Sequence, residues 1–497
     1  MSTLRGLLAT AGEEHTRRAM LVTLGAGLLV AGTSMLTMGW DATAAAVIPL
    51  VLALTIIMLR WPWLLFAFAL AQFSILPIEG HLFGFYVPNL SQFLMPALLL
   101  AMLATAAAKR NWGTFKIRAA DIFVLAFIAA AFIGMVVEPG PRQFKYFANQ
   151  VLFAIFMYFA ARWLDVDRKK LRLILGVVLA AAAIMLGDLA LVQLTGVGGM
   201  WDRDRGPLGS LSDQATYSAL FPALFLYMAV TVKGPSARRW RIFWLVATIL
   251  GVVATAGVKE RSGVVAALAT LAICGLHPKM MKYVAIGAVA LIPIGSLWLS
   301  TQVGREVHSR FTGDKDPMMR RRIYVGKAID YIKSENWHPL WGTGFGRLAK
   351  RSNSMLSETE VVWDPNTLRW RHVNEIGLRP IHCAPVTVFG EYGYVGLACL
   401  TGIAVCVVGS LIDVVFRARR KGATVDSALI VALGAAAVGL LVNALFHNTD
   451  VVFPVTSYLW AGIGLIIGHP QIFMIRGHVP TEEGGGHVSA AERSVSG

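Results

Sequence analysis

Apolar stretches of about 20 residues recur along the whole chain, and each is closed by charged or turn-forming residues. A helix of that length crosses a hydrocarbon core about 30 Å thick, so this pattern restricts the fold more than any single motif does. Charged residues make up only 15% of the 497 residues, compared with about a quarter in a soluble domain. We therefore expect an all-α polytopic membrane protein.

Apolar length and flanking charge delimit fourteen candidate spans. Two connections are very short: Trp40 and Asp41 alone join the first two spans, and the turn "GVKERSG" joins the ninth and tenth. We therefore expect about 12 to 14 transmembrane helices. The candidate spans lie near residues 19–39, 42–59, 62–78, 90–108, 119–137, 144–163, 171–195, 212–232, 241–257, 262–276, 282–300, 385–412, 426–446 and 450–469.

The distribution of basic residues predicts the orientation of these helices. The formal net charge is +16, but the lysines and arginines lie in short runs between apolar segments, so we do not expect nucleic acid as a partner. An even number of spans with both termini in the cytoplasm places these runs on the cytoplasmic side. The runs are Arg60, "KRNWGTFKIR", "DVDRKK", "KGPSARRWR", "HPKMMK" and "RARRK".

The chain divides into four parts. Residues 1–300 form an N-terminal bundle of transmembrane helices, and residues 385–470 form a C-terminal group. Between them, residues 301–384 make one external segment that contains the helical-looking stretch "MRRRIYVGKAIDYIKSEN". This segment is too long for a passive link, and we expect a partly helical cap over the outer mouth of the bundle. Residues 471–497 are expected to form a disordered cytoplasmic tail, because glycine, serine and glutamate are frequent there.

His382 stands where the external segment meets the next span. Pro385 follows in the first turn of the expected helix, where its missing N–H does no harm. The imidazole is therefore expected at the outer membrane surface. It has two interpretations: an interfacial histidine hydrogen-bonded to the loop backbone, or a base that takes a proton from a hydroxyl near neutral pH.

Several basic residues on the expected outer side are not needed for orientation. Arg205 lies in "WDRDRGPLGSLSDQATY" before the eighth span, and Lys259 and Arg261 lie in the "GVKERSG" turn. Either arginine alone can be explained by snorkelling of its side chain to lipid phosphates. Together with His382 they also fit a pocket for a phosphorylated group, because a guanidinium binds phosphate oxygens in pairs and stays charged.

Three further patterns have plainer interpretations beside a functional one. Asp450, in "LFHNTDVVFP", is either the N-cap of the last span or a carboxylate that orients an arginine or an acceptor. Arg321, within the arginine triplet 320–322, belongs either to a solvated helix face or to the cap over a donor. "GTGFG", at residues 342–346, follows no expected strand and is interpreted as a turn after a helix.

The four cysteines predict neither a disulfide nor a zinc site. Cys274, Cys399 and Cys406 fall within apolar stretches, and only Cys383 is expected in water. A single external cysteine has no intramolecular partner, and the spacings do not suit zinc.

Four of these segments resemble one family of membrane enzymes, in the order that the family has them. His382 and Cys383, followed after nine residues by Gly393 and then by Gly396, resemble the signature of the O-antigen ligase and Wzy-type polysaccharide polymerase superfamily. Three more segments resemble its other signatures: "RGPLGSLSDQATYSAL", "KERSGVVAAL" and "RRRIYVGKAIDYIKSENWHPLWGTGFG". The resemblance covers about residues 200–400. It departs from the family at Cys383, where asparagine, serine or glutamine is usual.

The resemblance implies a GT-C-like glycosyltransferase of the bacterial inner membrane with a periplasmic active site. It implies a polyprenyl-diphosphate-linked oligosaccharide as donor and a glycan as acceptor, on a lipid-linked repeat or a lipid A core, within membrane lipids. The family uses no metal ion, and we expect no cofactor. The implied roles are general base for His382, donor diphosphate binding for Arg205, Arg261, Arg321 and Lys259, and an orienting role for Asp450.

Two activities share these residues, and a third belongs to another class. A polysaccharide polymerase is favoured by the large cap and by Cys383, and an O-antigen ligase is the alternative. A lipid-linked sugar transporter or flippase would carry ionisable residues near the bilayer midplane. Here Asp188 is the main charge within a span, and the other polar residues gather at the expected outer surface, which favours the enzyme.

Overall fold

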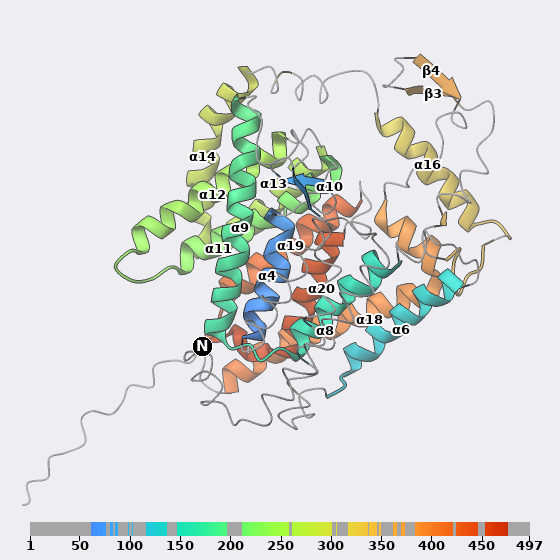
Figure 1. Ribbon diagram of the computed structural model, residues 1–497, viewed down its shortest axis with the longest axis horizontal. Helices are drawn as coiled ribbons and strands as arrows, with labels where there is room; N and C mark the ends of the chain where they lie inside the picture. Colours follow the sequence, from blue (N-terminus) through green and yellow to red (C-terminus); the bar gives the residue numbers. More distant parts are fainter. Residues whose placement is uncertain are drawn as a thin grey trace, which may run out of the picture.

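The structure of the chain is a computed structural model, drawn in Figure 1. Of the residues that it describes, 86% are helical, which confirms the predicted all-α class. The described residues are 61–75, 80–82, 85–87, 98, 102, 116–136, 147–195, 211–257, 261–300, 305, 317–335, 337–344, 347–348, 361–364, 369–372, 383–420, 424–445 and 453–475.

Within these ranges, five helices are long and apolar enough to cross a membrane. They are α6 (Ala119–Val136), α9 (Arg168–Thr195), α12 (Ala237–Gly257), α18 (Ala384–Arg420) and α19 (Ser427–Ala444). Four shorter apolar helices accompany them: α4 (Pro62–Ile75), α8 (Phe153–Trp163), α13 (Arg261–Gly275) and α20 (Phe453–Gly468). The chain is therefore a helical membrane protein, and most of its predicted spans coincide with these helices.

The described residues contain further helical elements. They are the π-helical turn η2 (Ala148–Leu152), α10 (Leu211–Ser218), α11 (Phe221–Thr231), α14 (Pro278–Ser300), α16 (Pro317–Ile332) and the 3-10 helix η6 (Pro470–Phe473). The helix predicted within the external segment corresponds to α16. The candidate spans 19–39 and 42–59, and nearly all of 90–108, lie outside the described residues.

Two predicted spans differ from the structure because each is a broken helix. The span 212–232 is two helices, α10 and α11, separated at Ala219 and Leu220. Pro222 follows in the first turn of α11, and a proline there removes a backbone donor and disfavours helix just before it. The span 385–412 is the longer α18, which is broken at Gly393, where φ is 61° and ψ is −159°.

Among the residues that the structure describes, three short antiparallel strand pairs add to the helices. β1 (Gly80–Leu82) pairs with β2 (Phe85–Val87), and β3 (Val361–Asp364) pairs with β4 (Arg369–His372) inside the predicted external segment. β5 (Thr424–Val425) pairs with β6 (Met474–Ile475), which joins the segment after α18 to the segment after α20. Two- to four-residue strands give too weak a periodic pattern to be recognised in sequence.

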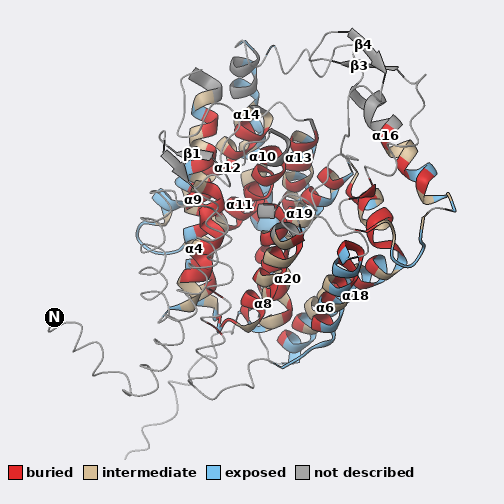
Figure 2. Ribbon diagram, turned by 45° about the vertical axis from the view of Figure 1, so that its right-hand side comes forward, coloured by how far each residue is buried: buried red, intermediate tan, exposed pale blue. Residues whose placement is uncertain are grey.

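Small residues let the helices of the bundle approach closely. α8 and α20 run side by side in the same direction, since Gly464 lies against the backbone of Tyr158 and Gly468 against that of Arg162. α13 and α19 run antiparallel, with Gly439 against Thr270. Close backbone approach of this kind is how helices associate in lipid, where burial of apolar surface gives little drive. Figure 2 shows the buried residues gathered where these helices face one another.

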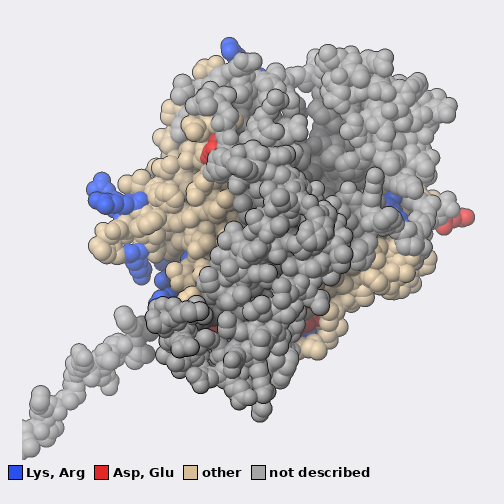
Figure 3. All heavy atoms as spheres, viewed as in Figure 1, with Lys and Arg blue, Asp and Glu red and all other residues tan. Residues whose placement is uncertain are grey.

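Large apolar side chains cover the outside of the described bundle. On α14, Ile286, Val289 and Ile292 are all exposed, as is Leu441 on α19. On the face drawn in Figure 3, a group of lysines and arginines stands at the left edge, and the described surface beside it is mostly free of charged residues. Such a surface suits contact with lipid.

The helix ends at one end of the bundle are joined by polar contacts. We call this the polar end and define it by Arg118, Arg162, Arg168, Asp426 and His469. Helices α6, α9 and α19 begin there, and α8, α18 and α20 end there (Figure 1). Its contacts include Arg118 with the Ile467 carbonyl, Arg162 with the Lys116 carbonyl at 3.0 Å, His469 with the Ala161 carbonyl at 3.1 Å, and Arg168 with Asp426.

Replacing Gly464 with alanine should lower the free energy of unfolding by about 1 to 3 kcal/mol. An added Cβ would lie 2.4 Å from the backbone oxygen of Tyr158 and would force α8 and α20 apart. Gly462→Ala is the matched control, because no atom lies within 4 Å of that Cβ position. We expect the apparent melting temperature in detergent to fall for Gly464→Ala alone. Equal melting temperatures for the two variants would contradict this packing.

Candidate functional site

Most residues predicted to form the site lie outside the part of the chain that the structure describes. These are Arg205, Lys259, His382 and Asp450. The backbone of Arg261 opens α13, and that of Arg321 lies within α16. The candidate site is therefore built from the helices that adjoin these residues in sequence, all at the end of the bundle opposite the polar end.

The first turn of α13 packs against α10. A Cβ added at Gly263 would lie 2.8 Å from the Cβ of Ala215, so this contact requires glycine. On α10, the next residue, Thr216, accepts a hydrogen bond of 2.8 Å from the amide nitrogen of Asn443. The start of α13, the middle of α10 and the end of α19 therefore meet. In sequence, Arg205 lies six residues before α10, and Asp450 follows α19.

A chain of hydroxyl groups joins α10 to α20 and α4. The Tyr458 hydroxyl donates to the Leu70 carbonyl at 2.9 Å, and the Tyr217 hydroxyl donates to Tyr458 at 3.0 Å. The hydroxyl of Ser74 lies 2.9 Å from that of Tyr217 and is left to act as the donor. Each hydroxyl in this series thus donates to the next group. The hydrogen bonds fix the short helix α10 against its two neighbours, α20 and α4.

Two buried amide oxygens near α10 receive no hydrogen bond from any described residue. They are Oε1 of Gln214 and Oδ1 of Asn443, and both side chains are fully buried. Their nitrogens are engaged: Gln214 Nε2 lies 3.2 Å from the Ser218 hydroxyl, and Asn443 Nδ2 binds Thr216. A buried acceptor without a donor costs about 1 to 3 kcal/mol. These oxygens therefore have acceptor capacity that no described residue uses.

The break in α18 is filled by a turn of the chain that comes before it. We call residues 338–344 the interface turn. Gly342 and Gly344 have φ of 65° and 86°, and a Cβ on either would lie 2.5 Å from backbone atoms of a neighbouring helix. Only glycine permits both that conformation and that approach. Four backbone hydrogen bonds join the turn to α18: Thr343 N to Gly390 O, Gly344 N to Glu391 O, Tyr394 N to Pro339 O, and Val395 N to Leu340 O.

Two charged residues beside the interface turn are almost completely buried. They are Glu391, in α18, and Arg347. The residues next to them touch, since a Cβ at Gly390 would overlap the side chain of Leu348. Buried charges in a membrane protein often mark functional positions. The sequence analysis missed both, although Glu391 is the only acidic residue between Glu375 and Asp413 and stood out in an apolar stretch.

The environment of Cys383, which follows His382 in sequence, differs from the one predicted. Cys383 is half-buried and packs against a small apolar cluster of Ala328, Tyr331 and Leu348. The thiol was predicted to lie in water, but α16 and the residues after the interface turn cover it. The start of α18 is thus held by packing from the predicted external segment.

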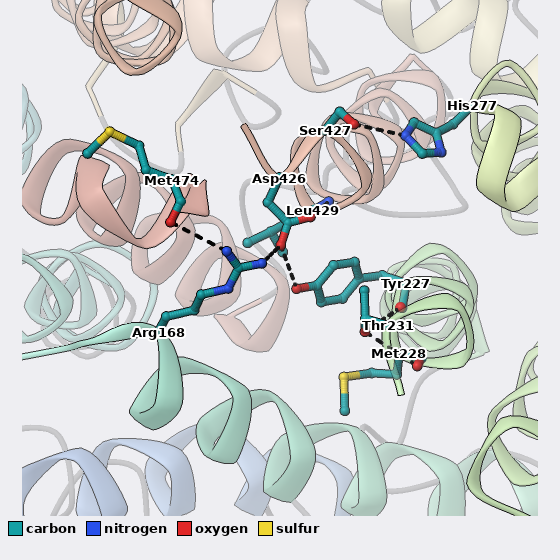
Figure 4. Close-up of polar contacts among 9 residues, drawn as sticks. All are labelled: Arg168, Tyr227, Met228, Thr231, His277, Asp426, Ser427, Leu429 and Met474. Atoms are coloured by element: carbon teal, nitrogen blue, oxygen red, sulfur yellow. Dashed lines mark hydrogen bonds and ion pairs between the residues drawn. The ribbon is translucent and has the colours of Figure 1, made fainter. Parts of the chain in front are cut away.

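The polar end contains a buried carboxylate, Asp426, with several partners (Figure 4). Asp426 forms an ion pair with Arg168, and the same oxygen accepts from the Tyr227 hydroxyl at 3.3 Å. Its other oxygen caps α19 by accepting from Leu429 N at 3.3 Å, and Arg168 also donates to the Met474 carbonyl at 3.4 Å. Both carboxylate oxygens are occupied, so we interpret this network as a structural link between α9, α11, α19 and β6.

The two ends of the bundle therefore differ. At the polar end the buried charges have partners within the protein. At the opposite end, two broken helices and two amide oxygens that receive no hydrogen bond from a described residue adjoin the predicted site residues in sequence or in space. The described residues contain no group of three or more histidine, cysteine, aspartate or glutamate side chains that could hold a metal ion.

Comparison with known proteins assigned no family. Neither a scan against models of protein families nor a search of curated proteins gave a match to this chain.

Replacing Asp426 with alanine should lower the free energy of unfolding by about 3 kcal/mol, because it leaves a partly buried arginine without its carboxylate and removes a helix cap. Asp413→Ala is the matched control, because Asp413 pairs with Arg417 on an exposed part of α18 and such pairs contribute about 0 to 1 kcal/mol. Thermal unfolding in detergent measures both. A loss of stability for Asp413→Ala as large as that for Asp426→Ala would contradict the structural role of the network.

His469 should make stability depend on pH. Burial lowers the pKa of this imidazole from 6.5 to about 4, and nearby Arg162 and Arg118 act in the same direction. The folded protein therefore keeps the ring neutral at pH values where the unfolded chain binds a proton. The contribution of His469 to the free energy of unfolding is therefore fully present above pH 6.5 and is lost as the pH falls towards 4. In melting curves between pH 7 and pH 4, His469→Gln should lose less stability than the wild type. Parallel curves would exclude this effect.

Proposed function

We propose that the chain is a membrane glycosyltransferase that joins a polyprenyl-diphosphate-linked glycan to an acceptor sugar, and that it acts as a polysaccharide polymerase. The observation that supports this most is the meeting of α10, α13, α19 and α20 at one end of the bundle. Arg205, Lys259, Arg261 and Asp450 adjoin the ends of these helices in sequence.

The proposed chemistry needs one base and a cluster of fixed positive charges. His382 takes the proton of the acceptor hydroxyl, whose oxygen attacks the anomeric carbon of the donor sugar. The bond from that carbon to the diphosphate breaks, and polyprenyl diphosphate leaves. Arg205, Arg261, Arg321 and Lys259 stabilise the negative charge that builds on the leaving group, in place of a metal ion. Asp450 orients an arginine or the acceptor.

The start of α18 gives His382 a rigid support in this proposal. Its first turns are held by the interface turn through backbone hydrogen bonds and by the packing around Cys383. A catalytic group acts best when neighbouring packing fixes its position. The buried Glu391 lies nine residues further along the same helix. We include it in the candidate site as an acidic group that supports the arginines or the acceptor.

The proposed setting is the inner membrane of a bacterium, with the site on the periplasmic side. The basic segments at the polar end then face the cytoplasm, as the positive-inside rule expects. The donor reaches the site from the membrane, because its polyprenyl tail stays in lipid while its diphosphate lies at the surface.

A transporter or flippase of lipid-linked sugars is the second candidate, and one observation favours it. Transporters often form their binding sites from discontinuous helices, and the described part of the chain contains two, the pair α10 and α11 and the helix α18. At both breaks, backbone groups form hydrogen bonds within the protein. This is compatible with a rigid site as well as with a moving gate.

Purified protein in lipid vesicles, given a synthetic polyprenyl-diphosphate oligosaccharide, should form a longer glycan, with a rate unaffected by a metal chelator. His382→Ala should lower the rate by about 10² to 10⁴, and Arg205→Ala and Arg261→Ala should lower it strongly because the leaving group loses a fixed charge. Arg239→Ala and Arg419→Ala, which change exposed arginines at the polar end, are the matched controls and should keep the wild-type rate.

The products distinguish the candidates. Growth by whole repeat units indicates a polymerase, and a single transfer to a lipid A core indicates a ligase. Movement of the lipid-linked sugar between leaflets without a new glycosidic bond indicates a flippase and would overturn the proposal. A wild-type rate in all three site variants would overturn the assigned roles.

A further inference from the structure

The length of α18 locates the break at Gly393 relative to the membrane. The helix has 37 residues in two pieces joined at Gly393, and the hydrocarbon core that it crosses is about 30 Å thick. Towards the polar end, Asp413 and Arg417 form an ion pair at 2.7 Å, and because charged side chains are costly in hydrocarbon, this pair places the water boundary near Asp413. Gly393 lies 20 residues before Asp413, or about 30 Å along the helix. The break therefore lies at the opposite hydrocarbon boundary.

Helix α6 gives nearly the same depth independently. It begins beside Arg118 at the polar end, and Gly134 lies 16 residues further on, or about 24 Å. Gly344 of the interface turn contacts the backbone of Gly134, since an added Cβ would lie 2.5 Å from its oxygen. Two helices thus place the interface turn close to the edge of the hydrocarbon core.

The backbone of the interface turn is paired in the way that this depth requires. Irregular backbone that meets lipid must find its hydrogen bonds within the protein. Four backbone hydrogen bonds, between 2.8 and 3.2 Å long, join the turn to both sides of the break in α18. A loop that lay in water would not need to fill a helix break in order to satisfy its polar groups.

The exposed residues of the interface turn are 338–341, and all of them except His338 are apolar. Leu340 is 50% exposed and Trp341 is 39% exposed. They adjoin Tyr394 and Leu397 of α18, which are 55% and 43% exposed and belong to its lipid-facing surface. Leu340 O is hydrogen-bonded to Val395 N, the residue after Tyr394. The exposed apolar surface of α18 therefore continues onto the turn.

Aromatic rings support this surface from behind. The ring of Trp337 lies 5.1 Å from that of Phe389 and 6.3 Å from that of Tyr394. The Trp337 indole nitrogen also donates to the Gly390 carbonyl at 2.9 Å. Tryptophan and tyrosine are enriched where proteins cross from hydrocarbon to headgroups, because their rings have an apolar body and a polar tip.

We propose that the interface turn is a membrane anchor: Leu340 and Trp341 insert into the lipid leaflet away from the polar end, at the boundary between acyl chains and headgroups. The partner is the lipid surface itself. The anchor ties residues 337–344 and the start of α18 to a fixed depth. This inference does not depend on the proposed enzymatic activity, because it follows from depth, backbone pairing and exposure alone.

Site-directed spin labelling of the full chain in lipid nanodiscs tests the anchor. The four native cysteines are replaced by serine, and single cysteines at 340 and 341 carry the label. A label at Leu397 is the lipid control, and a label at the exposed Glu335 is the water control. We expect labels at 340 and 341 to be more accessible to oxygen than to a water-soluble nickel chelate, as at 397, and the label at 335 to show the reverse order. Accessibility at 340 and 341 like that at 335, or exclusion of both agents, would overturn the proposal.

Photo-crosslinking of the unmodified chain provides a second measurement that needs no cysteine substitution. Phospholipids with a diazirine near the glycerol backbone are incorporated into the nanodisc, and labelled peptides are identified by mass spectrometry. The proposal expects adducts on peptides that contain Leu340 and Trp341. Adducts on the peptide of Leu397 without any on Leu340 or Trp341 would overturn it.

Discussion

The structure depends on one constraint: a polar group that is withdrawn from water into a membrane must find its partner inside the protein. The constraint explains two features of this bundle, a buried carboxylate at one end and a broken helix at the other. At the polar end, the buried carboxylate of Asp426 is surrounded by Arg168, Tyr227 and the first turn of α19. At the other end, the break in α18 exists because a turn of the preceding segment supplies the missing backbone partners.

The two ends of the bundle also differ in their polar contacts. The links at the polar end join segments far apart in sequence, and both oxygens of Asp426 are occupied by donors of the protein. The opposite end has open amide oxygens at Gln214 and Asn443 and a helix start held by packing. A membrane enzyme that acts on a charged lipid headgroup needs such an end, where polar groups lie next to lipid but are not all occupied by the protein itself.

The sequence predicted the fold class and most span positions because apolar length is a local property. It did not predict the breaks. Pro222 is a local signal that was passed over because it lies within an apolar run, whereas the break at Gly393 is explained only by its neighbour in space, the interface turn. The pairing of Arg168 with Asp426 joins residues 258 positions apart, and no local pattern indicates it. Glu391 could have been found as a lone acid in an apolar stretch. The roles of His382, Arg205 and Arg261 rest on resemblance and on the meeting of adjoining helices.

The central claim is that one imidazole and at least two guanidinium groups share a cavity at the end of the bundle away from the polar end. An electron cryomicroscopy map of the full chain in a nanodisc, with a polyprenyl diphosphate bound, tests it most directly. We predict density for the diphosphate within hydrogen-bonding distance of Arg205 and Arg261, with the ring of His382 facing the same cavity. Side chains of these three residues on separate surfaces, or a diphosphate bound elsewhere, would contradict the account.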